Sequence, residues 1–288
     1  MIYYITYVFF ILIIILWNYV AWTLRRSQSR ALKMLSGAKS SSLFDPDSPT
    51  WPIGCCVIAC DLEMRCWDLP IFDRRRGVWS LSFCGRRRRR VGYITKYKVG
   101  VRDTTLIVMS STWCCDDMAV SVDTALYDTP HSQFHRGYYI RARDTLEELK
   151  RDIPPKGDLL LVGHSLGGAL VGILTYLISL EFPECSIRTI TLGCPKYASL
   201  ELELWFKNRK VATTHYLNDA DPIIGKPLVA DLARIGREEH FKIDTGNDNI
   251  NHGLGIYKLG LTKGGFKQRR PRHTLGHLLS RIILDILS

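Results

Sequence analysis

The sequence predicts an α/β fold in which helices flank a mostly parallel central sheet. Two observations carry this prediction. Short apolar runs of strand length, such as 159–162 and 187–192, alternate with longer segments whose apolar residues recur at helical spacing. The chain of 288 residues, with 46% hydrophobic and 23% charged residues, is also large and apolar enough to bury one sizeable core.

The expected elements follow one another from residue 91 onward. Apolar positions at helical spacing predict a helix over 138–151, which Pro154 and Pro155 end. The continuous apolar run 159–162 predicts a buried strand, and the long apolar segment after it predicts a helix. In full, the expected order is strand 91–99, strand 105–109, helix 138–151, strand 159–162, helix 166–180, strand 187–192 and strand 212–217.

The segment 163–168, which reads GHSLGG, lies between the strand at 159–162 and the helix that follows it. The G-x-S-x-G pattern between strand and helix is typical of a nucleophile elbow, a turn so tight that the serine is strained and a side chain at the flanking positions would clash. Ser165 is therefore the expected nucleophile. The backbone N–H of Leu166, at the start of the helix, is an expected oxyanion donor. The alternative is a glycine-rich turn whose serine has no role.

A serine nucleophile needs a histidine base and a carboxylate that orients the histidine, and in α/β hydrolases the chain order is serine, acid, histidine. The acid is expected just after a strand. Asp219 and Asp221 both follow the strand at 212–217, and the proline after Asp221 holds that residue in an extended turn conformation. On spacing alone, either aspartate can serve.

Four histidines lie downstream as candidate bases, namely His240, His252, His273 and His277. His252 is preferred because it lies in a polar, loop-like stretch, residues 245–253, as the catalytic histidines of this fold do. His240 follows two glutamates, and the last two histidines belong to a basic terminal segment.

Residues 1–24 contain no charged side chain and predict one uncleaved transmembrane helix that precedes the α/β fold. At about 1.5 Å per residue, this segment spans a hydrocarbon core of about 30 Å. Tyrosines and tryptophans lie near both ends, and a basic flank of Arg25, Arg26, Arg30 and Lys33 follows. The positive-inside rule then predicts a single-pass membrane protein whose catalytic domain is cytosolic. A cleaved signal peptide is the less favoured alternative.

The formal net charge of +11 comes largely from basic clusters at 74–76, 86–90 and 267–272. Such clusters indicate an anionic partner, and phospholipid headgroups fit best. No recognised nucleic-acid-binding motif accompanies them, so nucleic acid is not expected, while solvated loops that only aid solubility are the plain alternative. After the last cluster, leucines and isoleucines recur at helical spacing. This pattern fits a helix on an anionic membrane surface and equally a terminal helix packed on the domain.

The nine cysteines are an odd number and lack the paired spacing of a zinc site. They fit reduced thiols, and no metal is expected.

Several segments, in the right order, resemble motifs of the class 3 lipases, the fungal-type triacylglycerol lipases, a family that includes membrane-anchored diacylglycerol lipases. The resemblance covers about residues 105–261. The matching segments are 135–139 (H-x-G-F in the family), 163–168 (G-H-S-L-G-G), 191–196 (T-F-G-x-P-R), 218–223 (N-x-x-D-x-V) and 252–257 (D-H-x-x-Y).

The resemblance implies an α/β-hydrolase fold and assigns site residues. It selects Asp221 over Asp219 as the acid and His252 as the base, and it places His240 nearer the family's non-catalytic histidine. The family's R-G-(T/S) segment is Ser110-Ser111-Thr112 here, so Thr112 matches the oxyanion threonine by position while the arginine and glycine are absent. The following residues, 113–126, are expected to form a lid with one apolar face.

The resemblance and the predicted anchor together predict a membrane-associated serine acylhydrolase, a lipase that cleaves ester bonds of acylglycerols with no metal or organic cofactor. Its expected partners are a lipid ester substrate and an anionic membrane surface. A phospholipase of the A1 type is one alternative. A non-catalytic, lipase-like protein that binds lipid or a partner is another.

Four regions are expected along the chain. They are a transmembrane anchor at 1–24, a juxtamembrane linker and irregular N-terminal segment at 25–75, a class 3 lipase-like α/β-hydrolase domain at 76–265, and a basic amphipathic helix at 266–288.

Overall fold

The computed structural model describes residues 51–56, 76–81, 88–99, 102–112, 115–209, 211–228 and 231–269. The predicted anchor at 1–24 lies outside these residues, as do most of the predicted linker and of the predicted terminal helix. Among the described helices, none combines the length and the apolar character that crossing a membrane requires.

One eight-stranded sheet organises the described residues, with strand order β1-β2-β3-β6-β7-β8-β9-β10. The strands from β3 to β9 run parallel, whereas β1 and β2 at one edge and β10 at the other edge pair antiparallel. The strands are β1 (Arg76–Leu81), β2 (Arg88–Val99), β3 (Arg102–Met109), β6 (Lys156–His164), β7 (Glu184–Leu192), β8 (Ala212–Asn218), β9 (Arg237–Phe241) and β10 (Lys267–Arg269).

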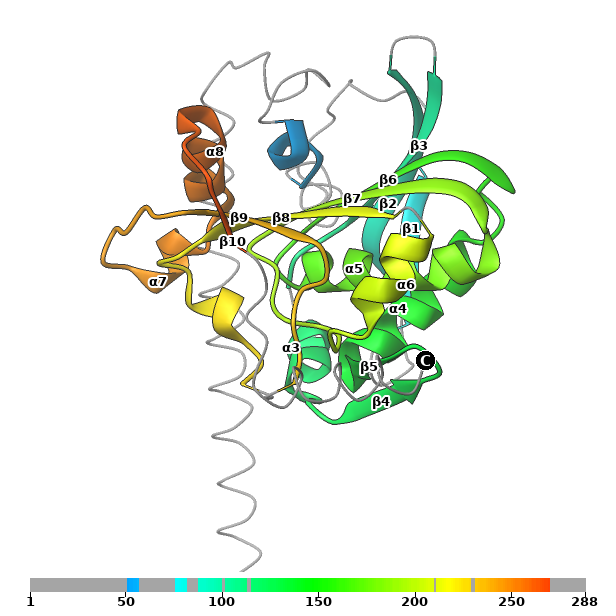
Figure 1. Ribbon diagram of the computed structural model, residues 1–288, viewed down its shortest axis with the longest axis horizontal. Coiled ribbons are helices and arrows are strands. Elements are labelled where there is room, and N and C mark those ends of the chain that lie inside the picture. Colours follow the sequence, from blue (N-terminus) through cyan, green and yellow to red (C-terminus); the bar gives the residue numbers. More distant parts are fainter. Residues whose placement is uncertain are drawn as a thin grey trace, which may run out of the picture.

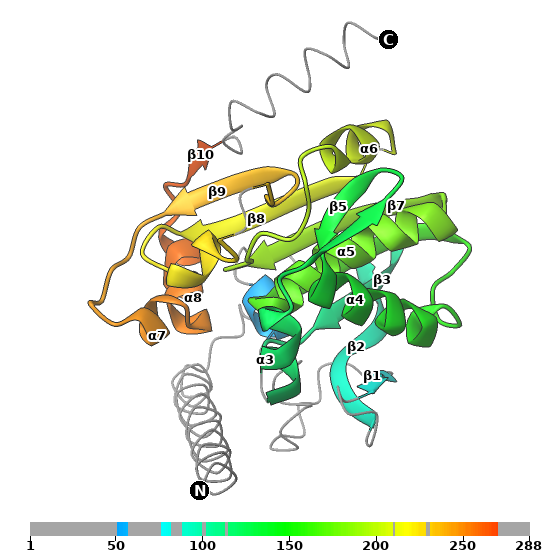
Figure 2. The ribbon, with the colours of Figure 1, turned by 90° about the horizontal axis from the view of Figure 1, so that it is seen from below.

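Helices cover both faces of this sheet, as Figures 1 and 2 show. The labelled helices are α3 (Cys115–Val122), α4 (Arg136–Leu149), α5 (Leu166–Glu181), α6 (Leu202–Asn208), α7 (Asp248–Asn251) and α8 (Leu254–Lys263), with a 3-10 turn η2 (Pro222–Gly225). Residues 51–56 are also helical. In Figure 1, α4, α5 and α6 lie on one face and α8 on the other. A small hairpin of β4 (Leu126–Thr129) and β5 (Ser132–His135) lies farther from the large sheet than α4 (Figure 1).

Two apolar cores fill the spaces between sheet and helices. The larger contains the buried faces of α4 and α5, and the smaller joins residues 51–56 and α8 to the other face of the sheet. Helix α5 is buried from Leu166 to Ser179, which explains why its sequence is apolar on every side. Strand β6 is buried from Leu159 to His164 between β3 and β7. The elbow therefore connects a central strand to a buried helix.

The predicted mostly parallel sheet with flanking helices is confirmed, and every strand and helix expected between residues 91 and 217 is present with shifted ends. The prediction of a terminal helix over 266–288 is wrong for its first residues. Lys267–Arg269 form strand β10, because their backbone pairs with Glu238–His240 of β9 at the open sheet edge. The sheet therefore extends past residue 265, the boundary that the sequence predicted for the α/β domain.

Candidate active site

Ser165 lies in a strained turn between β6 and α5. Its φ of 56° and ψ of −127° make it the only non-glycine residue with a positive φ among the described residues. A Cβ at Gly163 would stand 2.2 Å from the carbonyl oxygen of Gly167, and one at Gly167 would stand 2.4 Å from that of Met109. Only glycine fits at either position, as the pattern predicted. Strain of this kind costs about 1–3 kcal/mol, and the packed strand and helix hold it in place.

The structure brings Ser165, His252 and Asp221 into one line of hydrogen bonds. Ser165 Oγ lies 2.8 Å from Nε2 of His252, and Nδ1 of His252 lies 2.7 Å from Oδ2 of Asp221. The side chain of Asp221 is fully buried, while that of His252 is 20% exposed. Serine, histidine and carboxylate thus have the geometry that activates a hydroxyl for attack on an acyl group.

The carboxylate of Asp221 is held by more than the histidine. Its Oδ1 accepts the backbone N–H of Ile223 at 2.8 Å, so Asp221 caps η2, and its Oδ2 accepts the hydroxyl of Tyr257 at 2.7 Å. Burial raises the pKa of Asp221, but the hydrogen bonds and the charge of His252, together with these two donors, outweigh burial and bring it below its ordinary value. Asp221 is thereby kept ionised beside the histidine.

Asn218, the last residue of β8, joins the acid turn to the histidine loop. Its amide donates to the carbonyl oxygens of Ile243 at 2.9 Å and Asn251 at 3.1 Å, and its Oδ1 accepts the N–H of Ile243. Because Asn251 precedes His252 in the chain, the Asn218 side chain holds the backbone directly before the candidate base in place. Neither Asn218 nor Tyr257 was predicted to have a role, although both lie inside the segments 218–223 and 252–257 that carry the resemblance.

The loop after β3 packs directly on the elbow. Ser110 donates both its N–H and its hydroxyl to the carbonyl oxygen of Val91, at 2.8 and 3.0 Å, which anchors the loop to β2. Gly167 lies so close to the carbonyl oxygens of Met109 and Ser110 that no side chain fits between them. Thr112 follows this anchored stretch and is half-buried. The loop is therefore ordered against the nucleophile turn without the family's arginine and glycine.

The predicted lid at 113–126 contains helix α3 and reaches the first residue of β4. Val120 is buried against α4, where a Cβ on Gly137 would meet its carbonyl oxygen at 2.1 Å, while Val122 is 68% exposed. The segment thus presents an apolar side chain to solvent at the end of α3.

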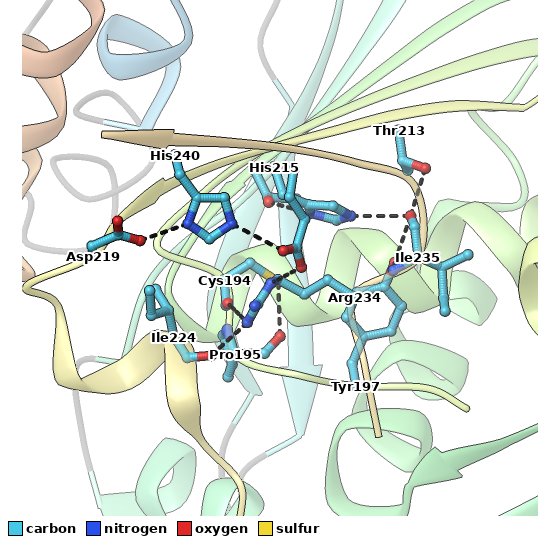
Figure 3. Close-up of polar contacts among 12 residues, drawn as sticks. Cys194, Pro195, Tyr197, Thr213, His215, Asp219, Ile224, Arg234, Ile235 and His240 are labelled. Carbon is cyan, nitrogen blue, oxygen red and sulfur yellow. Dashed lines mark hydrogen bonds and ion pairs between the residues drawn. The ribbon is translucent and has the colours of Figure 1, made fainter. Parts of the chain in front are cut away.

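Asp219 and His240, the rival candidates, belong to a separate network (Figure 3). Asp219 Oδ1 lies 2.7 Å from His240 Nδ1, whose ring bonds Glu238 at 3.0 Å, and Glu238 accepts Arg234 Nε at 2.8 Å. Arg234 also donates to the carbonyl oxygens of Cys194 and Ile224, at 3.1 and 2.5 Å. The network therefore ties β9 to the turn that carries Asp221, and it leaves Asp219 outside the Ser165 site.

Opposing effects set the charges of this network. Burial lowers the pKa of His240, but the hydrogen bonds and charges of Glu238 and Asp219 outweigh it and the net shift is upward. Burial raises the pKa of Glu238, yet the hydrogen bond from His240 and the charge of Arg234 lower it to about 2. Glu238 is therefore a buried carboxylate whose ionised form is stabilised by His240 and Arg234.

Arg234→Met is expected to lower the free energy of unfolding by about 3 kcal/mol at neutral pH, because it leaves the Glu238 carboxylate buried without its cation. Urea unfolding measures this loss. Arg143→Met is the control, since Arg143 and its partner Asp144 are 50% and 52% exposed and such pairs contribute less than about 1 kcal/mol. An equal loss in the two variants would contradict the structural role given to Arg234.

Residues 103–230 match the family model of the class 3 lipases. No curated protein sequence matches the chain. Among solved structures, a lipase from Rhizopus microsporus var. chinensis is similar, with 12% identity over 76% of this chain and 87% of that chain and a TM-score of 0.53. Lipase II from Rhizopus niveus has 15% identity, coverages of 69% and 80%, and a TM-score of 0.50. A triacylglycerol lipase from Penicillium expansum has 21% identity, coverages of 59% and 71%, and a TM-score of 0.45.

Proposed function

We propose that this chain, whose residues 103–230 match the class 3 lipases, a family of carboxylic ester hydrolases with an α/β-hydrolase fold, is a membrane-associated serine acylhydrolase of acylglycerols. The observation that carries the proposal is the line of hydrogen bonds from Ser165 through His252 to the buried Asp221, at 2.8 and 2.7 Å. The strained turn at Ser165 and the three hydrogen-bond donors to the Asp221 carboxylate, from His252, Ile223 and Tyr257, support it.

In the proposed reaction, Ser165 Oγ attacks the acyl carbonyl carbon while Nε2 of His252 takes its proton. Asp221 accepts the Nδ1–H of His252 and stabilises the imidazolium that forms. The N–H groups of Leu166 and Thr112 are proposed to bind the oxyanion of the tetrahedral intermediate. The histidine then protonates the departing alcohol, and water, activated by the same histidine, releases the fatty acid from Ser165.

The proposed substrate is an acylglycerol within a lipid surface. The exposed Val122 on α3 supports the proposal that this segment contacts lipid when it opens, since moving an apolar side chain from water into lipid lowers the free energy. Three lysines, Lys242, Lys263 and Lys267, line a cavity of about 370 Å³ at the corner of α8, β9 and β10. Their charge supports contact with anionic phospholipid headgroups.

We expect fatty acid release from dispersed diacylglycerol and triacylglycerol, and a higher rate when anionic phospholipid is added to the dispersion. The double variant Lys242→Glu, Lys263→Glu should lose the increase, while Lys156→Glu, an exposed lysine where β6 begins, should keep it. Release of fatty acid, followed by titration, measures both effects.

Two outcomes of this experiment would replace the proposal. Release of fatty acid from the phospholipid rather than from the acylglycerol would favour a phospholipase of the A1 type. Absence of hydrolysis with every lipid and with short-chain esters would favour a non-catalytic protein that binds lipid or a partner.

A further inference from the structure

Ser111 and His164 form a second serine–histidine contact beside the proposed triad. Ser111 lies in the loop after β3, at a position where the family segment has glycine, and His164 is the last residue of β6, directly before Ser165. Ser111 Oγ lies 2.6 Å from Nδ1 of His164. The two residues are 3% and 4% exposed, so water does not compete for this hydrogen bond.

The partner of the second ring nitrogen decides what this pair can do. Nε2 of His164 lies 2.9 Å from the backbone carbonyl oxygen of His252. A carbonyl only accepts hydrogen bonds, so Nε2 carries the proton, Nδ1 of the neutral ring is the acceptor, and the hydroxyl of Ser111 donates to it. Among the described residues, no carboxylate accepts from Nε2 of this histidine, in contrast to His252, whose Nδ1 bonds Asp221.

His164 is also a weak base. Burial, and next the charge of His252, lower the pKa of His164 to about 3. Its ring therefore stays neutral near neutral pH and does not take a proton from Ser111. Neutrality matters for the proposed reaction, because the rings of His164 and His252 are stacked with centroids 4.8 Å apart, and a charged His164 would oppose the imidazolium that forms on His252.

The pair links three parts of the site. Ser111 belongs to the loop that carries Thr112, His164 precedes the nucleophile, and the carbonyl that His164 binds belongs to the proposed base. The next residue back, Ser110, anchors the same loop to β2. Hydrogen bonds thus connect β2 to the loop, the loop to the imidazole of His164, and this imidazole to the backbone of His252.

We propose that Ser111 and His164 are positioning residues. The Ser111 hydroxyl orients the neutral ring of His164, and this ring holds the backbone and ring of His252 in line with Ser165. The inference rests on the proposed function, because it assumes that His252 is the base. Removing the Ser111 hydroxyl frees Nδ1 of His164, lets the ring rotate, and releases the carbonyl of His252. A misplacement of about 1 Å in such a site costs up to about a hundredfold in rate.

Ser111→Ala is expected to lower kcat for a soluble short-chain ester by about ten- to a hundredfold while KM changes by less than about twofold, since the hydroxyl orients the base and does not bind substrate. Ser111→Cys, which keeps the volume and has a weaker donor, should fall between wild type and Ser111→Ala. Ser179→Ala is the matched control. Ser179 is also 3% exposed and donates to a backbone carbonyl, that of Tyr176, near the far end of α5.

A double-variant cycle tests whether Ser111 acts through His164. His164→Gln removes the ring that Ser111 orients, so adding Ser111→Ala to His164→Gln should lower kcat by less than about twofold further. Independent losses that multiply in the double variant would overturn the proposal. So would wild-type kcat in Ser111→Ala, or a loss that lies in KM alone.

Two further measurements separate the possible failures. Melting temperatures show whether each variant is folded. If Ser111→Ala does not fold, the kcat of Ser111→Cys is compared with wild type instead. The parallel assay of Ser165→Ala tests the proposed function itself. Hydrolysis retained by Ser165→Ala would reject the proposed function, whereas hydrolysis lost in Ser165→Ala but unchanged in Ser111→Ala would reject only the positioning role.

Discussion

Ser165→Ala is expected to lower kcat for short-chain nitrophenyl esters by about a million-fold, to a residual rate that the oxyanion donors alone provide. The expected size follows from the geometry, because Ser165 Oγ is the only atom of the triad placed to attack an acyl carbon, with Nε2 of His252 2.8 Å away to take its proton. The measurement is steady-state hydrolysis together with labelling by a fluorophosphonate, which reacts with an activated serine.

The result is informative only if the variant is folded. Alanine at position 165 keeps the Cβ and so the strain of the positive φ, and the packing of Gly163 and Gly167 around the turn is unchanged. The melting temperature should therefore stay within a few degrees of wild type. Fluorophosphonate labelling that persists in Ser165→Ala would contradict the assignment of the nucleophile, and labelling of Ser111 in its place would reverse the roles given to the two serines.

Asp221→Asn is expected to lower kcat by about ten-thousand-fold with little change in KM. Asparagine keeps the size of the side chain, but its amide no longer fixes the proton of His252 on Nδ1, so Nε2 is not free to accept the proton of Ser165. The Tyr257 hydroxyl, which donates to Oδ2 of Asp221, then lies beside an amide instead of a carboxylate. Stopped-time assays of the same nitrophenyl ester at several pH values measure the loss.

Asp219→Asn is the matched control for this prediction. Asp219 is two residues away in the same turn, and the sequence pattern alone left both aspartates open. Its carboxylate bonds His240 rather than His252, so kcat should fall by less than about tenfold. Equal losses in the two variants would mean that the turn tolerates no change, and a larger loss in Asp219→Asn would make Asp219 the acid.

Local sequence patterns were sufficient for the central part of the fold. The apolar run 159–162 and the long apolar segment after it predicted a buried strand and a buried helix, because both elements need apolar side chains and their lengths differ. The glycine at 163 also follows from local sterics, since a Cβ there would stand 2.2 Å from the carbonyl oxygen of Gly167, whereas a Cβ at Gly167 would meet the distant carbonyl oxygen of Met109 at 2.4 Å. These elements were predicted with ends that shift by a few residues.

Other elements could not be predicted from the local sequence. The hairpin of β4 and β5 has short strands of four residues each, with mixed exposure and no alternation strong enough to predict them. Strand β10 was predicted as part of a helix, because the apolar periodicity after it suggested one. It is a strand because the edge of β9 offers unpaired backbone groups to it.

By itself, the sequence determined that a strained serine stands between a buried strand and a buried helix, because that turn is specified by adjacent residues. Spacing alone left the acid and the histidine open, the motif resemblance selected Asp221 and His252, and the tertiary structure brings these two side chains to the serine. The N–H of Asp219 still bonds the carbonyl oxygen of Phe241 on β9, which keeps Asp219 beside His240, whereas the N–H of Asp221 closes a turn onto Asn218. That turn directs Asp221 to His252, 31 residues away in the chain. Backbone pairing between distant strands, which no local pattern encodes, therefore separates the two aspartates.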